Sequence, residues 1–270
     1  MNKKPLLPMK DNVVFPMFFA DERDTESLTG FLQSVLKLSA DEYEILEITD
    51  PHLLQEHKDD KLSIVDIKLK TKNDKIIHIE IQRKVPDTFR NRIMFYVCKL
   101  ITEQLGGDKK RYEDVNKVIS IVITDEVLID ECEKYHHHFT FCDPECENAV
   151  VLSDLVEVYT VELSKLPQNP DGTNLYDWAS FIAAETEEEL DMIAARNPEF
   201  GRTVIKLREM SASEKARAEY ERRQKAERDF IMFVDAAEKK GRDEERQIIE
   251  NNLKSMGLTP EQITEAMKRE

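Results

Sequence analysis

The chain has 270 residues, of which 40% are hydrophobic and 35% are charged, and it contains only 7 glycines. This composition excludes a chain that is disordered over most of its length, and it favours long solvated helices over an all-β protein rich in tight turns. No run approaches 18 consecutive apolar residues, which excludes a membrane-spanning helix. Because Pro5, Pro8 and Pro16 interrupt the apolar stretch that a signal peptide would need, we expect a cytoplasmic protein.

The formal net charge of −16 is distributed unevenly along the chain. Between Lys58 and Arg111 there are 14 Lys or Arg residues and 8 Asp or Glu residues, so this segment carries +6 and the remainder carries −22. A locally basic segment is compatible with a nucleic-acid partner, whose phosphates bind Lys and Arg. The alternative is an ordinary solvated surface.

The first half of the chain predicts an alternation of helices and strands. Residues 24–37 have apolar side chains at the spacing of one helix face, with Asp24 or Thr25 as the N-cap. The elements expected next are strands at 43–49, 62–71 and 75–83, with a turn at 72–74, then a helix at 89–105 and a nearly continuous apolar strand at 115–124. This order predicts an α/β sandwich with a mixed sheet.

The second half of the chain is predicted to become helical. Residues 139–141 and 156–163 have the pattern of further edge strands, and a segment rich in Pro and Gly at 165–172 breaks the pattern. Beyond it we expect a helix at 174–195, an exposed helical stretch after 210, and two short helices around Gly257, where Thr259 and Gln262 form a capping box. We interpret the last pair as a small interaction hairpin, with a helix-turn-helix as the alternative. The predicted domains are a core at 1–166 and a helical region at 173–270.

Two acidic residues, Asp66 and Glu80, lie among β-branched residues in the strands of the predicted hairpin. Because successive side chains of a strand alternate between faces, Glu80 and Gln82 share one face with His78. Asp66 lies on that face only if residues whose numbers sum to 146 are paired, which requires an odd-length loop such as 72–74 or a bulge. A loop of two or four residues places the two carboxylates on opposite faces.

Two convergent carboxylates in a partly buried site repel each other unless a cation binds. Oxygen ligands with few His or Cys residues favour Mg²⁺ or Mn²⁺ over Zn²⁺. Such an ion can activate water and neutralise the charge that develops on a phosphodiester. The alternative is a solvent-facing hairpin whose polar side includes Asp66 and Glu80.

A zinc site near His136–His138 is a separate metal hypothesis. Cys142 and Cys146 are three residues apart instead of the common two, and only Cys132 offers a third thiolate. The alternative is a loop in which Cys and His occur together without a metal.

The pattern Asp-x13-Glu-x-Gln across a hairpin, followed by a helix with basic and aromatic residues, resembles the PD-(D/E)XK nuclease superfamily. More closely, it resembles the Rpn recombination-promoting nucleases, or PD-(D/E)XK nuclease family transposases. The resemblance covers nearly the whole chain, in the segments 11–15, 31–36, 65–67, 79–82, 92–96, 118–121, 161–165 and 257–263, with Trp178 and Phe181. It implies a restriction-endonuclease-like α/β core, with a mixed central sheet flanked by helices, and a helical C-terminal region.

The resemblance also implies roles for individual residues. The catalytic residues would be Asp66, Glu80, Gln82 and Lys84, the metal ligands would be Asp66, Glu80 and the carbonyl of Ile81, and the DNA-binding residues would be Lys61, Lys68, Arg92 and Tyr96. Gln82 stands where the wider superfamily has lysine. Because an amide can orient water but cannot act as a base or supply positive charge, Lys84 or Lys61 is expected to supply that charge. For Arg92 and Tyr96, packing on the helix surface is the alternative.

The function implied is a DNA endonuclease that depends on Mg²⁺ or Mn²⁺, has low sequence specificity and is linked to recombination or mobile elements. Two residues depart from the family pattern, since Pro16 replaces a usual lysine and Val65 replaces the proline before Asp66. One alternative is a catalytically weak or inactive DNA- or protein-binding module of a mobile-element or defence system. A third alternative is an oligomerisation protein whose C-terminal helices drive assembly. DNA is the expected partner, and a homodimer through the helical C-terminal region is a further expected interaction.

Overall fold

The structure is a computed structural model that describes residues 5–21, 24–37, 45–49, 67–105, 111–146, 149–260 and 262–263. The chain divides into two compact units, Met1–Arg217 and Ala218–Glu270. This division does not coincide with the predicted boundary between residues 166 and 173. The helices that follow residue 173 belong to the first unit because their aromatic side chains are part of its core.

The described elements follow one another in the order that the sequence predicted for the first half of the chain. They are α1 (Val14–Phe19), α2 (Glu26–Leu36), β1 (Ile45–Thr49), β2 (Ile67–Thr71), β3 (Ile76–Gln82), α3 (Phe89–Thr102), β4 (Val118–Thr124), β5 (His136–Asp143), β6 (Val150–Glu162), α4 (Asn174–Ala183), α5 (Glu187–Arg196), α6 (Phe200–Ala212) and α7 (Glu214–Ser255). Short 3₁₀ helices lie at Glu103–Leu105, Tyr112–Asp114 and Leu163–Lys165. The main departures are α1, which was not predicted, and the greater length of β5 and β6.

The strands in the described part of the chain form one six-stranded mixed sheet in the order β1-β2-β3-β4-β6-β5. The pairs β3–β4 and β4–β6 at the centre of the sheet are parallel, and the pairs β1–β2, β2–β3 and β5–β6 are antiparallel. Every residue of β4 is buried, as its continuous apolar sequence predicted. The α/β fold with a mixed sheet is thereby confirmed.

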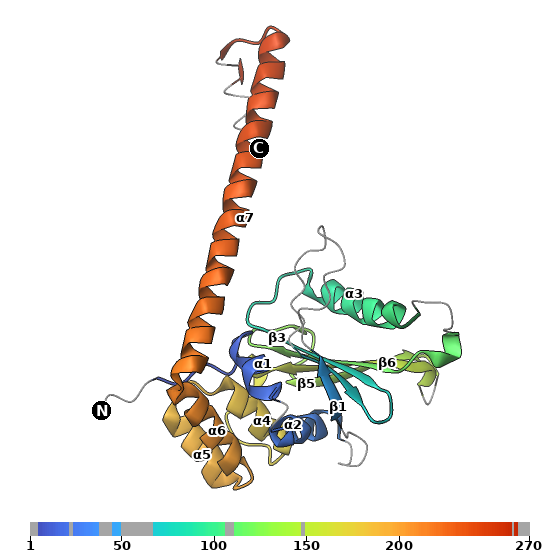
Figure 1. Cartoon of the computed structure of the whole chain (residues 1–270). Coiled ribbons are helices and arrows are strands. Elements are labelled where there is room, and N and C mark those ends of the chain that lie inside the picture. The colour runs from blue at the N-terminus through green and yellow to red at the C-terminus, as the bar shows by residue number, and fades with distance from the viewer. Residues whose placement is uncertain are drawn as a thin grey trace. The chain divides into compact units, whose positions relative to one another are not determined.

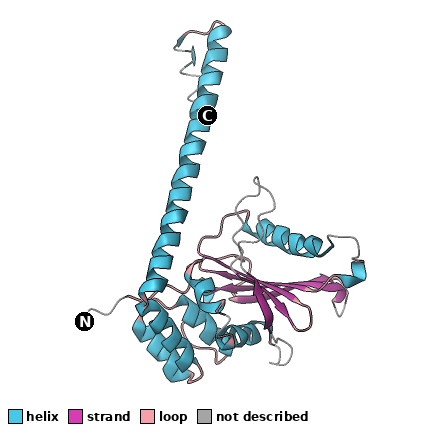
Figure 2. Ribbon diagram, in the orientation of Figure 1, coloured by secondary structure: helices cyan, strands magenta, loops and turns pink. Residues whose placement is uncertain are grey.

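Helices cover both faces of this sheet, as Figure 2 shows. One face is covered by α3, whose Phe89, Ile93 and Val97 pack with Val122 of β4 and Val158 of β6. The other face lies toward α1, α2 and α4, where Phe19, Phe31 and Trp178 pack against one another with ring centroids 5.5–6.1 Å apart. These two apolar layers hold the polar side chains of the sheet in fixed positions.

Local signals explain where the helices differ from the prediction. The helix α1 tolerates Pro16 because a proline in the first helical turn removes no intrahelical hydrogen bond. The single helix expected at 174–195 is two helices, because Thr186 and Glu189 form a capping box that starts α5 anew. None of the helices in the described ranges is long and apolar enough to cross a membrane.

In the second unit, the described residues form the long helix α7 from Ala218 onward, a turn and the start of a further helix. The segment expected to be a short helix at 248–256 is the end of α7, and Gly257 follows it with φ of 84°. The capping box at the next helix start is confirmed, since Thr259 N donates to Gln262 Oε1 at 2.9 Å and Gln262 N donates to Thr259 Oγ1 at 3.3 Å.

Candidate functional site

The β2–β3 hairpin has the register that would place two carboxylates on one face. Ile67 pairs with Ile79 and Lys68 with His78, so the numbers of paired residues sum to 146. Residues 72–75 separate the two strands, but Thr71 N still donates to the carbonyl of Lys75 at 3.0 Å. The turn beyond this last pair is therefore residues 72–74, of which Asp74 has a left-handed φ of 59°. This is the odd-length loop that the sequence allowed. Asp66 and Lys61 lie outside the described residues, so their roles stay predictions.

Glu80 is buried on β3, and its contact with α3 defines the site. Glu80 is only 5% exposed, and its Oε1 accepts a hydrogen bond of 2.7 Å from Arg92 Nη2. The same Nη2 also donates to Gln82 Oε1 at 2.7 Å. Glu80 and Gln82 therefore share one face of the strand, as the alternation of side chains predicted.

Arg92 is held over this face by its own packing. Its guanidinium lies 4.4 Å from the ring centroid of Phe89, one turn earlier on α3. Burial raises the pKa of Glu80, and the charge and hydrogen bond of Arg92 oppose this rise. The guanidinium of Arg92 thus places a positive charge beside Glu80, the predicted metal ligand, and Arg92 faces the site directly.

The second carboxylate oxygen of Glu80 has a different environment. Glu80 Oε2 is buried and has no hydrogen-bond partner within the described residues. A buried carboxylate oxygen without a donor is costly unless water or a cation binds it. This unpaired carboxylate oxygen fits a ligand to a hard divalent ion, and the sharing of such an ion with Asp66 stays a prediction.

His78 lies on the same face of β3 and contacts the neighbouring strand β4 and the helix α3. His78 is buried, its Nδ1 lies 3.3 Å from Ser120 Oγ of β4, and its ring contacts Tyr96 edge-to-face at 6.4 Å. Burial, together with the charge of Lys68, lowers the pKa of His78 to about 4. Lys68 itself forms an ion pair of 3.5 Å with Glu103. Tyr96 and Lys68 thus lie near the site, on α3 and β2.

Two further predicted site residues lie in other environments. The strand expected to reach Arg83 ends at Gln82, so Lys84 is exposed in a bend beyond it and is not on the strand face. Ile81 is buried and paired with Ile123 of β4, with its side chain on the opposite face from Glu80. The role of its carbonyl as a metal ligand remains a prediction.

A row of polar residues crosses the carboxyl ends of the parallel strands and was not predicted. Gln82 pairs with Thr124, and Thr124 pairs with Glu162, so all three side chains share one face. Thr124 Oγ1 and Glu162 Oε1 are buried without a hydrogen-bond partner in the part of the chain that the structure describes. Glu162 could have been found by the same sequence pattern as Glu80, because it is a charged residue between the apolar residues Val161 and Leu163.

Glu162 also holds the loop that follows β4. Its Oε2 accepts hydrogen bonds from the backbone N–H groups of Leu128 at 2.8 Å and Ile129 at 3.1 Å. Lys165 forms an ion pair of 3.0 Å with the same carboxylate and donates to the carbonyl of Cys132 at 2.6 Å. This pair therefore fixes the loop that borders the site, since Asp125 N of the loop donates to the carbonyl of Gln82 at 3.1 Å.

The zinc hypothesis is not supported among the residues that the structure places. In those residues no group of three or more His, Cys, Asp or Glu side chains is arranged to hold a metal ion. His136 and His138 instead stack on Tyr159, at centroid distances of 6.0 and 4.2 Å. The histidine rings are therefore used in packing.

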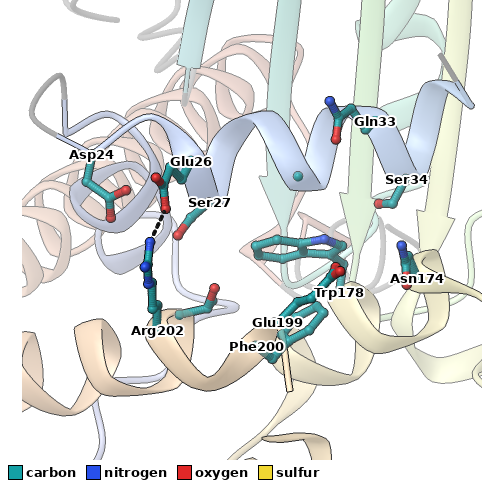
Figure 3. A pocket seen from close by; sticks show the side chains of 12 residues that line it. Asp24, Glu26, Ser27, Gln33, Ser34, Asn174, Trp178, Glu199, Phe200 and Arg202 are labelled. Atoms are coloured by element: carbon teal, nitrogen blue, oxygen red, sulfur yellow. Dashed lines mark hydrogen bonds and ion pairs between the residues drawn. The ribbon is translucent and has the colours of Figure 1, made fainter. Parts of the chain in front are cut away.

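A cavity of about 390 Å³ lies apart from these residues, between α2, α4 and α6. Figure 3 shows Trp178 and Phe200 beneath α2, with Arg202 bonded to Glu26 across the rim at 3.2 Å. None of the predicted site residues is among the residues that line it. The chemistry indicated by Glu80 and Arg92 therefore does not belong to this cavity.

Comparison with known proteins identifies one family. The family model described as PD-(D/E)XK nuclease family transposase matches residues 8–237. Searches of curated proteins and of solved structures found no match. The match spans α1 to most of α7 and therefore includes Glu80, Gln82 and Arg92.

Proposed function

Because the chain belongs to the PD-(D/E)XK nuclease family transposases, we propose that it is a DNA endonuclease that depends on Mg²⁺ or Mn²⁺. Membership implies a nuclease-like function linked to mobile elements. The observation that carries the finer proposal is Glu80, whose buried Oε2 has no donor among the residues that the structure describes and which lies on a hairpin with the required register. Low sequence specificity is proposed because no base-reading element is recognised in the sequence.

In this proposal each residue of the hairpin has a separate task. Asp66 and Glu80 hold the divalent ion, which when bound would activate water and neutralise charge on the phosphodiester. The amide of Gln82 orients the attacking water, because Arg92 fixes its Oε1 and leaves its NH₂ group to donate. Lys68 and Tyr96 contact the DNA backbone, and Lys84 or Lys61 supplies the positive charge that Gln82 lacks.

A second candidate function is a DNA- or protein-binding module without catalysis. The ion pair between Arg92 and Glu80 favours it, because the guanidinium already neutralises the carboxylate without a metal. The absence of the superfamily lysine at Gln82 also favours it. The two candidates differ in what Glu80 does, and this difference can be measured.

The test is a plasmid-nicking assay with Mg²⁺, Mn²⁺, Ca²⁺ or EDTA, comparing the wild type with Asp66→Asn and Glu80→Gln. We expect nicking that needs a divalent ion. Its rate should fall by at least about a hundredfold in either variant, because removing one group that stabilises charge in the transition state typically costs that much. Asp74→Asn is the matched control, because it removes a carboxylate from the same hairpin at the exposed loop and should leave nicking unchanged.

Binding of Mn²⁺ by calorimetry separates the two candidate functions. An endonuclease should bind Mn²⁺ and lose that binding in Glu80→Gln, whereas a binding module should be indifferent to the change. Nicking that survives both Asp66→Asn and Glu80→Gln would contradict the assignment of the site. Absence of nicking together with a DNA gel shift would support the binding module.

A further inference from the structure

The far end of the β5–β6 hairpin extends beyond the layers that cover the sheet (Figure 1). All residues of β5 from Phe139 to Asp143 and all residues of β6 from Val150 to Asp154 are exposed. The exposed side chains include large apolar ones, with Phe141 at 49% and Leu152 at 85%. A two-stranded ribbon with exposed apolar side chains is only marginally stable in water, so this ribbon is suited to binding a partner.

The backbone of β5 is also available for pairing. In the sheet, β5 is the last described strand on its side, next to β6 alone. Glu162 N donates to the carbonyl of Tyr135 at 2.7 Å. Because hydrogen-bonding direction alternates along an antiparallel strand, the N–H and C=O groups of His136, His138 and Thr140 point away from β6 toward the sheet edge.

The irregularity of the hairpin leaves this edge continuous. Thr140 pairs with Glu157, whereas Phe141 pairs with Ser153, so the additional residues of the bulge belong to β6. The register therefore changes on the inner strand, and β5 itself runs from His136 to Asp143 without an insertion. An unbroken outer edge is what another strand would need for pairing.

We propose that β5 pairs in antiparallel orientation with β5 of a second copy of this chain, with Thr140 facing Thr140 across a twofold axis. In this arrangement Phe139 of each copy faces Phe141 of the other. Two cross-strand aromatic pairs would then cover side chains that are now exposed. A twofold axis requires a self-complementary surface, and this pairing satisfies that requirement.

The charges along β5 support a second copy as the occupant. The segment begins with Lys134 and His137 and ends with Asp143 and Glu145. Antiparallel pairing about Thr140 brings the basic beginning of one copy beside the acidic end of the other, whereas parallel pairing would place like charges together. The carboxylates of Asp143, Glu145 and Asp154 would repel the phosphates of nucleic acid. This inference is independent of the proposed nuclease activity.

The test measures the mass of the full chain in solution by light scattering and sedimentation velocity. The wild type should be a dimer, and Thr140→Pro should be a monomer because proline removes the N–H that points to the second copy. That N–H does not bond to β6, so the variant should stay folded and keep its circular dichroism spectrum. Leu152→Ser is the matched control, since it removes an exposed apolar side chain from β6 and should leave the dimer intact.

A pair of charge variants tests the proposed register. Phe139→Glu alone and Phe141→Lys alone should each lose the dimer, because a charge would face a phenylalanine. Mixed together, they should form a heterodimer in which Glu at position 139 of one copy faces Lys at position 141 of the other. A monomeric wild type, a dimer that survives Thr140→Pro, or a mixture that stays monomeric would each overturn the proposal.

Discussion

Arg92 joins the two polar side chains on which the candidate site depends. One nitrogen of its guanidinium bonds both Glu80 Oε1 and Gln82 Oε1 at 2.7 Å. The wider superfamily has a lysine at the position of Gln82, and here the guanidinium of Arg92 from the neighbouring helix contacts the Gln82 side chain. Because Glu80 is nearly fully buried, the pair matters more for stability than a surface ion pair would.

Replacing Arg92 should therefore destabilise the fold. Arg92→Met leaves the buried Glu80 carboxylate without its partner, and we expect the free energy of unfolding to fall by about 3 kcal/mol in urea denaturation. The double variant with Glu80→Gln should recover part of this loss, because it removes the unpaired charge. If Arg92→Met alone were as stable as the wild type, the ion pair would have no structural role.

The pH dependence of stability follows from His78. Its folded-state pKa is lowered to about 4 by burial, so below its ordinary value of 6.5 the unfolded chain binds a proton that the folded chain does not. The free energy of unfolding should therefore decrease as the pH falls from about 6.5 to about 4. Above pH 6.5 the titration of His78 should not change it. His136, whose pKa burial also lowers to about 4, acts in the same direction.

The measurement is urea denaturation of the wild type and of His78→Gln at a series of pH values. The variant should show a smaller decrease in stability between about pH 6.5 and pH 4, with the remaining decrease coming from His136 and from carboxylates whose pKa is lowered, such as Glu157 and Glu189. Equal slopes for the two proteins would show that His78 does not control this dependence.

At the scale of elements, the packing of α2 on α4 depends on one glycine. A Cβ atom at Gly30 would lie 3.1 Å from Cζ2 of Trp178, closer than ordinary van der Waals contact. Trp178 is nearly fully buried and packs against Phe19, Phe31 and Phe200, so it has little room to move. Gly30 thus allows two helices that are distant in sequence to approach each other.

Two glycine substitutions should have opposite effects on stability. Gly30→Ala should lower the free energy of unfolding by about 1 kcal/mol, because the cost of overpacking exceeds the better helix propensity of alanine. Gly201→Ala on α6 is the matched control, since no atom lies within 4 Å of its Cβ position, and it should stabilise by about 0.5 kcal/mol. Chemical denaturation of both variants checks the signs, and a stabilising Gly30→Ala would contradict the close packing.

At the scale of the whole molecule, the two units differ in how they are stabilised. The first has the sheet and the aromatic layer, whereas α7 carries ion pairs along its surface, such as Lys240 with Glu244 at 3.6 Å and Lys254 with Glu250 at 2.5 Å. Exposed pairs of this kind contribute little to the stability of a folded unit, because solvent screens them. Met232 and Phe233 of α7 are exposed.

Removal of residues 218–270 should leave the first unit folded. We expect its melting temperature in calorimetry to change by less than about 4 °C, because its core lies within Met1–Arg217. The mass in solution of this truncated protein distinguishes the two predicted dimers. A dimer through β5 persists after the truncation, whereas a dimer through the helical C-terminal region, as the sequence suggested, becomes a monomer.

The elements with strong periodicity were predictable. The strands β3 and β4 and the helix α3 have nearly complete apolar patterns, and the structure places them within a few residues of the predicted bounds. The ends of β5 and β6 were not predictable, because their outer residues are exposed and mix apolar with polar side chains. The helix α1 was missed because Pro16 argues against a helix unless it falls in the first turn.

For the candidate site, the alternation of side chains along the strand was enough to predict that Glu80 and Gln82 share a face of β3. It left the register of Asp66 against Glu80 open, because that depends on whether the loop has an odd or even number of residues. The tertiary structure shows the register of β2 against β3 from Ile67 onward, and it brings Arg92 of α3 against Glu80 and Gln82. Pairing between strands and packing of a helix on a sheet join residues that are distant in sequence, so local patterns do not specify them.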